Sequence, residues 1–393
     1  MISTSNRATG PHIVGGSLAA AEDSPDHMRI TDDGTYVVLL GTQGGPIPGK
    51  RAATSSALIV DGDIYIVDAG SGLPIRFSEA GLAFNKVRGM FITHLHSDHV
   101  ADYFNFFSLN WTNWDHEHQT IQVHGPGRAA DNGPEGSDAP GLPSLFAPIV
   151  VPALSTPGIA DITRLSIEAN AYDLNERLRS TRRKGDVPLD PTGQVGIPML
   201  ATHDIPTPSE SNVDNWCPRM DPIPVYQDDN VTVTATLVDH PPVFPAFAFR
   251  FETRHGSVVF SGDTSPCENL IALASGADVL VNEVMDLEAG IAKFENTPIH
   301  DTMTRQFTSA HTTLRGRHLP DGTYVPSVGE LAHECGVHAL VLNHLYPGDG
   351  SVTNDEFKAG AQRDYDGTVV VGDDLTVVRM VRAAETAGAA ISH

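Results

Sequence analysis

His94-Leu95-His96-Ser97-Asp98-His99 is the stretch of this 393-residue sequence that decides its fold and its chemistry. It directly follows a short apolar run that predicts a buried strand ending at Thr93. Residues two apart on an extended segment point the same way, so the first two histidines can present imidazoles to one cation. The aspartate and the last histidine, at the expected start of a helix, can reach a second cation. The pattern therefore predicts a two-zinc centre, because imidazole and carboxylate groups suit zinc.

Composition narrows the class of partner. Acidic residues outnumber basic ones, 49 against 25, which gives a formal net charge of -24. Because so acidic a surface repels phosphate backbones and nucleic-acid binders usually carry a basic stripe, we expect no nucleic-acid partner. No apolar run approaches the ~18 residues that span a bilayer, so we expect no membrane partner and a cytoplasmic location.

The pattern of apolar runs predicts one α/β domain. Residues 1–34 are expected to form an N-terminal extension, and residues 35–393 a single domain with an inserted segment at about 128–230 that is rich in Pro, Gly and Asp. Tyr36–Leu40, the hairpin 57–67 and the runs at 231–238, 246–252, 257–260, 278–281 and 339–342 predict strands. A helix is expected over 167–183 and a final hairpin over 368–380. Two sets of strands with interleaved helices predict four layers, with helices outside and two sheets inside.

Further motifs resemble those of the metallo-β-lactamase superfamily, whose fold is a four-layer αββα sandwich. They are Asp68-Ala69-Gly70 at a strand end, Asp239-His240-Pro241, Gly262-Asp263-Thr264, and Asn343-His344-Leu345. The resemblance implies that His94, His96 and His240 hold one zinc ion, that Asp98, His99 and His344 hold the second, and that Asp263 bridges them. It further implies that Asp98 orients the nucleophile while it ligates.

Two assignments leave alternatives open. His203 competes with His240 as the third ligand of the first zinc ion, although a family-like strand and the Gly-Asp-Thr turn follow His240 directly. Asp68 is expected to orient a ligand histidine through its other ring nitrogen rather than to bind metal.

Several motifs resemble the ribonuclease Z and arylsulfatase branch of that superfamily. These are Leu40-Gly41-Thr42, Gly125-Pro126, Asn282-Glu283-Val284 and His311-Thr312-Thr313. The last is similar to the His-Ser-Thr element whose histidine assists the leaving group in ribonuclease Z. His311 is therefore a candidate catalytic residue, with an exposed loop histidine as the alternative.

The departures from ribonuclease Z shape the functional prediction. Ribonuclease Z proteins that carry their own tRNA-clasping arm place it between the third histidine and the Gly-Asp-Thr turn, whereas here a plausible β-hairpin fills that interval. We therefore expect a hydrolase of a small-molecule ester, lactone or aryl-type substrate, in which a hydroxide held by two zinc ions is the nucleophile. A lid formed by residues 128–230 would meet Trp111 and Trp114 over the substrate, and a homodimer is left open.

Other activities remain as alternatives, since the same nucleophile serves many bonds. They are an arylsulfatase or phosphodiesterase of the ribonuclease Z-like type, a hydrolytic dehalogenase of an aromatic compound, and a metal-free or di-iron member of the fold without hydrolytic activity.

Overall fold

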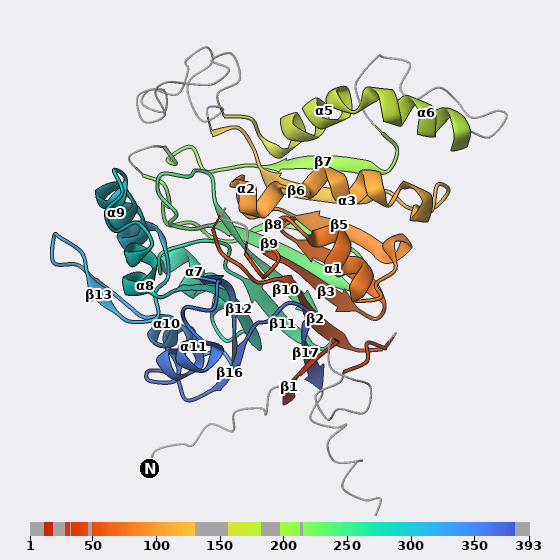
Figure 1. Ribbon diagram of the computed structural model, residues 1–393. Helices are drawn as coiled ribbons and strands as arrows, with labels where there is room; N and C mark the ends of the chain where they lie inside the picture. The colour runs from red at the N-terminus through yellow and green to blue at the C-terminus, as the bar shows by residue number, and fades with distance from the viewer. Residues whose placement is uncertain are drawn as a thin grey trace, which may run out of the picture.

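The computed structural model describes residues 12–18, 28–31, 33–45, 49–129, 156–181, 197–212 and 215–381. Within these ranges two large sheets pack face to face, and helices cover both outer faces (Figure 1). This is the four-layer α/β architecture that the sequence predicts.

The first sheet has eight strands, and its spatial order departs from chain order only at one end. From one edge to the other it contains β1 (His12–Ser17), β17 (Thr376–Val381), β2 (Thr35–Gly41), β3 (Ser55–Val60), β4 (Asp63–Val67), β5 (Val87–Phe91), β6 (Ile121–Pro126) and β7 (Leu200–Ile205). The pairs from β4 to β7 are parallel, whereas those from β1 to β4 are antiparallel.

The second sheet has seven strands. In spatial order they are β16 (Thr368–Val371), β15 (Ala339–Tyr346), β12 (Val279–Met285), β11 (Gly256–Phe260), β10 (Phe247–Thr253), β9 (Val231–Leu237) and β8 (Ile223–Gln227). A separate two-stranded ribbon joins β13 (Arg317–His318) to β14 (Tyr324–Val325).

Helices follow the strands on both sides. Those of the first half are α1 (Leu73–Glu79), η1 (Phe84–Lys86), α2 (Ser97–Val100), α3 (Tyr103–Leu109), η2 (Trp111–Asn113), α5 (Ile159–Ala169) and α6 (Ala171–Thr181). Those of the second half are α7 (Glu268–Ala274), α8 (Leu287–Ala292), α9 (His300–Ala310), α10 (Val328–Cys335) and α11 (Asn354–Ala361).

Three apolar layers hold the four structural layers together. One lies between the first sheet and α1, α3, α5 and α6, and another lies between the second sheet and α7, α10 and α11. The middle layer joins the inner faces of both sheets and includes Val37, Phe91, Phe249 and Val258. Because β2 has apolar neighbours on both faces, all seven of its residues are buried, which explains its unbroken apolar sequence.

The strands that matter for function all end at the same edge of the molecule. β4 and β5 are parallel in the first sheet, and β11, β12 and β15 are parallel in the second. A backbone hydrogen bond links the two sheets at this edge, where Phe247 N–H at the start of β10 donates to Thr93 O after β5 at 2.9 Å. The segments that leave these strand ends therefore converge.

Several expected elements differ from the structure. Residues 368–380 do not form a hairpin, because β16 joins the second sheet and β17 the first. The helix expected over 167–183 is two helices, α5 and α6, separated at Asn170, whose side-chain amide donates to Ser166 O at 2.8 Å. Part of the expected N-terminal extension is paired, since β1 lies antiparallel to β17.

The segment 128–230 is more integral to the fold than an insertion lying over the core. Its described residues supply β7 at the edge of the first sheet and β8 at the edge of the second, together with α5 and α6. Residues 130–155 and 182–196, which carry much of the expected lid, lie outside the described residues. Among the helices in the described ranges, none is long and apolar enough to cross a membrane.

Candidate metal centre

The loop after β5 brings four polar side chains into the interior. His94 and His96 lie on the extended segment that precedes α2, and Asp98 and His99 lie in the first turn of that helix. His94 and His99 are almost fully buried, and Asp98 is 6% exposed. Three later segments reach the same place: His240 follows β9, Asp263 follows β11, and His344 lies on β15 in a left-handed backbone conformation with φ 45°.

The first group of ligand-type atoms comes from His94, His96, His240 and Asp263, whose donor atoms all lie within 4.8 Å of one another. Nε2 of His94 lies 3.0 Å from Nδ1 of His96, and Nε2 of His240 lies 3.4 Å from that same Nδ1 atom. Three neutral imidazoles and one carboxylate form a donor set that zinc accepts.

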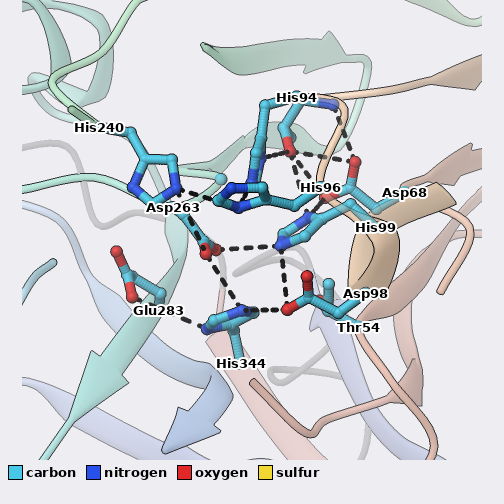
Figure 2. A network of polar contacts seen from close by, with 12 residues as sticks. Thr54, Asp68, His94, His96, Asp98, His99, His240, Asp263, Glu283 and His344 are labelled. Carbon is cyan, nitrogen blue, oxygen red and sulfur yellow. Dashed lines mark hydrogen bonds and ion pairs between the residues drawn. The ribbon is translucent and has the colours of Figure 1, made fainter. Parts of the chain in front are cut away.

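The second group comes from Asp98, His99, Asp263 and His344, again within 4.8 Å. Nε2 of His344 lies 3.3 Å from Oδ2 of Asp98 and 3.2 Å from Oδ2 of Asp263. Nε2 of His99 lies 3.3 Å from Oδ1 of Asp263. Figure 2 shows the carboxylate of Asp263 between His240 on one side and His99 and His344 on the other.

The two groups share Asp263, and its surroundings favour a cation. Oδ1 of Asp263 and Nε2 of His99 are buried, and neither has a hydrogen-bond partner within the described part of the chain, although they lie 3.3 Å apart. A buried donor or acceptor without a partner costs about 1–3 kcal/mol, and a shared metal ion would satisfy both atoms. The residues therefore fit a dinuclear metal centre.

The outer ring nitrogens fix how the imidazoles point. His99 Nδ1 lies 2.8 Å from the carboxylate of Asp68, which also accepts a hydrogen bond from Thr93 N–H at 2.8 Å. His240 Nδ1–H donates to Ala310 O at 3.0 Å. In both residues Nε2 is left to face the cluster, which is the arrangement that orients metal-binding histidines. Asp68 therefore has the position expected from the sequence.

Charge separates the histidines into two kinds. Burial lowers the pKa of His240 to about 3 and that of His94 well below its usual value, so both rings are neutral, as ligands must be. Burial also disfavours the cationic form of His99, but the carboxylates of Asp263 and Asp68 outweigh it and raise the pKa well above its usual value, so a metal bound there would displace a proton from the ring. The Asp263 pKa is held well below its usual value, against the effect of burial, by His344 and His99.

His311 and Glu283 form a buried pair beside the cluster. His311 Nδ1 lies 2.9 Å from Oε2 of Glu283, and the same carboxylate accepts a hydrogen bond from Thr264 N–H. Burial disfavours the imidazolium of His311, but Glu283 outweighs this effect and raises the His311 pKa. His311 is thus a buried, oriented histidine rather than an exposed loop residue.

Glu283 was not among the site residues predicted from the sequence. It belongs to the family-like motif Asn282-Glu283-Val284, it contacts His311, and its Oε2 lies 3.7 Å from Nδ1 of His344. The signal that could have found it is an acidic residue in a strand whose seven residues are all buried, since buried carboxylates are rare unless they have a partner.

The alternative histidine and the two tryptophans lie elsewhere. His203 is an exposed residue of β7 that stacks on His124 with ring centroids 4.6 Å apart and contacts Gln122 at 2.8 Å. Trp111 and Trp114 are buried in the layer beneath α3. His240, not His203, is therefore the histidine that the fold brings to the cluster.

Two cavities open from the cluster in different directions. One, of about 340 Å³, extends from His96, Asp98 and Asp263 toward α8 and α9. The other, of about 380 Å³, extends from Asp98 past Ser97 to Arg51 and Gln43. The described residues of 128–230, Trp111 and Trp114 line neither cavity, so the lid stays a prediction.

Comparison with known sequences identifies relatives over most of the chain. The chain is 28% identical over 342 residues to the ribonuclease Z of Mycobacterium bovis (strain BCG Pasteur), covering 86% of this chain and 96% of that protein. It is 29% identical over 347 residues to the ribonuclease Z of Mycolicibacterium gilvum, covering 88% and 96%. Residues 36–110 also match the family described as Anti-Pycsar protein Apyc1.

Solved structures agree at the level of the fold. The metallo-β-lactamase fold protein YhfI from Bacillus subtilis is 16% identical with a TM-score of 0.51, over 88% of this chain and 99% of that one. The short form of human tRNase Z is 18% identical with a TM-score of 0.50, over 87% and 98%.

These relatives correct the functional prediction. A small-molecule ester or lactone hydrolase without a nucleic-acid partner is wrong, because the relatives that match this chain nearly end to end are named ribonuclease Z. The error had two sources. Net charge describes the field of the whole chain and not the chemistry of one site, and the lack of a basic arm between His240 and Asp263 was taken to exclude RNA. The prediction of a metal-dependent hydrolase is confirmed. The chain therefore has the metallo-β-lactamase fold, and over most of its length its sequence is similar to ribonuclease Z proteins.

Proposed function

We propose that this protein is a zinc-dependent phosphodiesterase that hydrolyses RNA. The observation that carries the proposal is the shared carboxylate: Asp263 belongs to both ligand groups, and the buried His311–Glu283 pair lies against them. A two-ion centre clamps the attacking and leaving oxygens of an in-line displacement at phosphorus. The relatives named ribonuclease Z supply the substrate class.

In this proposal each predicted residue keeps its role. His94, His96 and His240 would hold one zinc ion, Asp98, His99 and His344 would hold the other, and Asp263 would serve both. Two bound zinc ions would lower the pKa of bound water to about 7 and neutralise charge on the phosphoryl oxygens. Asp98 accepts a hydrogen bond as it ligates, which orients the attacking group. A cytoplasmic location, the single domain of residues 35–393 and a homodimer stay predictions.

Residues of the chain itself protonate the leaving group in this proposal. The Glu283 carboxylate fixes Nδ1 of His311, so that Nε2 is the nitrogen that faces substrate, and His311 lines the cavity of about 340 Å³ that extends toward α9. The Glu283 carboxylate also raises the pKa of His311 against the effect of burial, which favours the protonated ring. His311 donates that proton to the departing sugar oxygen as the bond from phosphorus to that oxygen breaks.

The test compares metal-loaded and metal-free protein on matched nucleic acids. Zinc-loaded protein, carrying about two equivalents by metal analysis, is incubated with a labelled RNA oligonucleotide, a DNA oligonucleotide of the same sequence and a transfer RNA transcript. We expect RNA cleavage that prolonged chelation abolishes and zinc restores. Asp263→Ala should abolish cleavage, whereas His203→Ala on β7 is the control that keeps it.

Two results would contradict the proposal. Full activity in metal-free protein would remove the metal mechanism. Hydrolysis of bis(p-nitrophenyl) phosphate by zinc-loaded protein that leaves every RNA intact would keep the phosphodiesterase chemistry and remove RNA as the substrate.

A further inference from the structure

The cavity toward α8 and α9 is polar at one end and apolar at the other. The polar end consists of metal-centre side chains, including His96, Asp98 and Asp263. The apolar end is lined by Met285, Phe294, Ile299, Met303, Phe307 and Tyr346. No lysine or arginine lines this cavity, so within the described residues its apolar end offers nothing that would hold a phosphate.

The apolar end is a wall of side chains that are packed against one another. Met285, Phe307 and Tyr346 are buried and form a small core of their own, against which Phe294 and Met303 pack. The rings of Phe307 and Tyr346 are tilted at 63° with centroids 5.2 Å apart, and Phe294 meets Phe307 edge-on at 5.7 Å. These contacts hold aromatic surfaces in fixed directions around the cavity.

The apolar wall begins next to the His311–Glu283 pair. The ring centroids of Phe307 and His311 are 6.0 Å apart, and α9, which carries Phe307 and Met303, ends at Ala310, whose carbonyl accepts the hydrogen bond of His240. The helix that forms the wall is therefore anchored to the metal cluster itself. A group that enters the apolar end lies on the same side as the proton donor for the leaving group.

A nucleotide, like this cavity, is strongly polar at one end and largely apolar at the other. Its phosphate is anionic, whereas its base is flat, uncharged and able to stack on aromatic side chains. The volume of about 340 Å³ lies within the ~300–1,000 Å³ typical of small-ligand sites. Gln306, on the same helix, adds an amide that can donate to and accept from a base edge.

We propose that the apolar wall formed by Phe294, Met303 and Phe307 binds the base of the nucleotide on the leaving-group side of the scissile phosphate. This inference rests on the proposed RNA hydrolysis. The phosphate lies at the metal cluster, the sugar whose oxygen departs passes His311, and the base stacks against the wall. Phe294 and Met303 are then residues that determine how well a substrate is positioned, and they take no part in the chemical step.

The experiment removes the base from one side of the cleaved bond at a time. Product ends of wild-type cleavage are mapped first, because a 3′-hydroxyl and a 5′-phosphate assign the 5′ nucleotide to the leaving side, and the opposite ends assign the 3′ nucleotide. Oligonucleotides with an abasic residue on the leaving side or on the other side are then compared with the intact RNA. We expect wild-type kcat/KM to fall about tenfold for the leaving-side abasic RNA, and much less for the other.

Variants assign that preference to the wall. The double variant Phe294→Ala/Met303→Ala should cleave intact RNA about tenfold more slowly and the leaving-side abasic RNA within about twofold of wild type, so the preference disappears. Phe294→Trp, which keeps an aromatic face, should retain it. Leu109→Ala on α3 is the matched control, because it also truncates a partly exposed apolar side chain (66% exposed) and lines neither cavity.

A binding measurement separates the two hypotheses. Calorimetry on zinc-loaded protein compares adenosine monophosphate, with its phosphate on the oxygen that product mapping identifies as leaving (3′ or 5′), with the corresponding ribose phosphate. The nucleotide should bind more tightly, and the double variant should lose that difference. If wild type cleaves RNA with no base preference, or if the double variant keeps the preference, the base site is overturned while RNA hydrolysis stands. If no RNA is cleaved yet the base-dependent binding is lost in the double variant, the proposed function fails and the base site remains.

Discussion

At the scale of single residues, the centre depends on which atoms of each histidine face inward. His240 and His99 commit Nδ1 to Ala310 O and to Asp68, so Nε2 is the atom available to a metal. Sequence motifs identified the residues but not the ring nitrogen, which depends on partners up to 70 positions away in the chain. The tautomer is therefore a property of the fold. So is the choice of histidine, since His203 has the right chemistry but lies on β7 outside the cluster.

Stoichiometry tests the choice between those two histidines. His240→Ala should lose about one zinc equivalent, because it removes one of three imidazoles from the first ligand group. His203→Ala should keep both ions, since that ring stacks on His124 and contacts Gln122 outside the cluster. Metal analysis of the two proteins after dialysis decides the matter, and the reverse pattern would move the third ligand to β7.

The role of His311 is testable through the leaving group. His311→Ala should lower kcat on RNA by about 10²–10⁴-fold, because a sugar oxygen leaves poorly without a proton. It should affect bis(p-nitrophenyl) phosphate far less, since p-nitrophenolate needs no proton to depart. Glu283→Gln should also lower kcat on RNA more than on bis(p-nitrophenyl) phosphate. The loss should be smaller than for His311→Ala, because the amide still reaches Nδ1 of His311.

Zinc content is the control for these two variants. It should stay at about two equivalents in both, since His311 and Glu283 lie beside the proposed ligands. An equal loss of rate on the two substrates would show that His311 acts through the fold or the metal, and not as a proton donor.

At the scale of elements, local pattern predicted the strands and missed some pairings. β9, β10 and β11 lie within one residue of their expected limits at each end, because their apolar runs are bounded by turn signals. β16 and β17 look like a hairpin locally, but β16 pairs with β15 and β17 pairs with β1 and β2. No short-range signal encodes which sheet a strand joins.

The wall of the proposed base site could not have been predicted for a related reason. α9 carries polar and charged residues along most of its length, and its three cavity-lining residues, Met303, Gln306 and Phe307, give no motif. Their proximity to the metal cluster follows from the hydrogen bond between Ala310 and His240. By contrast, the seven proposed ligands all belong to short motifs at strand ends, where a parallel arrangement brings such residues together.

A charged contact fixes α5 against the end of β6. The Arg128 guanidinium donates two hydrogen bonds to the carboxylate of Asp161, at 2.5 and 2.6 Å, and lowers the Asp161 pKa. Asp161→Asn should lower the free energy of unfolding by about 1 kcal/mol or less, because the Arg128 side chain is 43% exposed and solvent screens the pair.

The pH dependence of that difference has a defined sign. Because the folded pKa is depressed, the stabilisation is present above the unfolded value of about 3.9 and is lost as pH falls through the folded pKa. Denaturant unfolding of metal-free wild type and Asp161→Asn should therefore show a constant difference above about pH 5 that disappears in acid. A difference that grows in acid would contradict this account.

At the scale of the whole molecule, the sequence predicts no RNA-binding arm after His240, although relatives of the chain are named ribonuclease Z. The interval between His240 and Asp263 is filled by the paired strands β10 and β11. The chain also carries a net charge of -24. Under the proposed function, the negative electrostatic field of the whole molecule repels RNA. Contacts within the two cavities beside the metal cluster must then provide the binding.

That balance predicts an unusual response to salt. Raising monovalent salt from about 10 mM to about 150 mM shortens the Debye length from roughly 30 Å to roughly 8 Å, which screens the repulsion between the chain and RNA. We therefore expect kcat/KM on RNA to rise over this range, and kcat/KM on bis(p-nitrophenyl) phosphate, a small monoanion, to rise much less.

A fall in kcat/KM on RNA with increasing salt, with a log–log slope near -0.7 per phosphate contacted, would instead indicate a local basic surface that binds single-stranded RNA. The one basic cluster in the sequence, Arg179-Ser180-Thr181-Arg182-Arg183-Lys184, would then be the first candidate. Replacing Arg182, Arg183 and Lys184 by alanine should flatten that slope if the cluster binds RNA, and should leave a rising salt profile unchanged if the global field alone governs the approach.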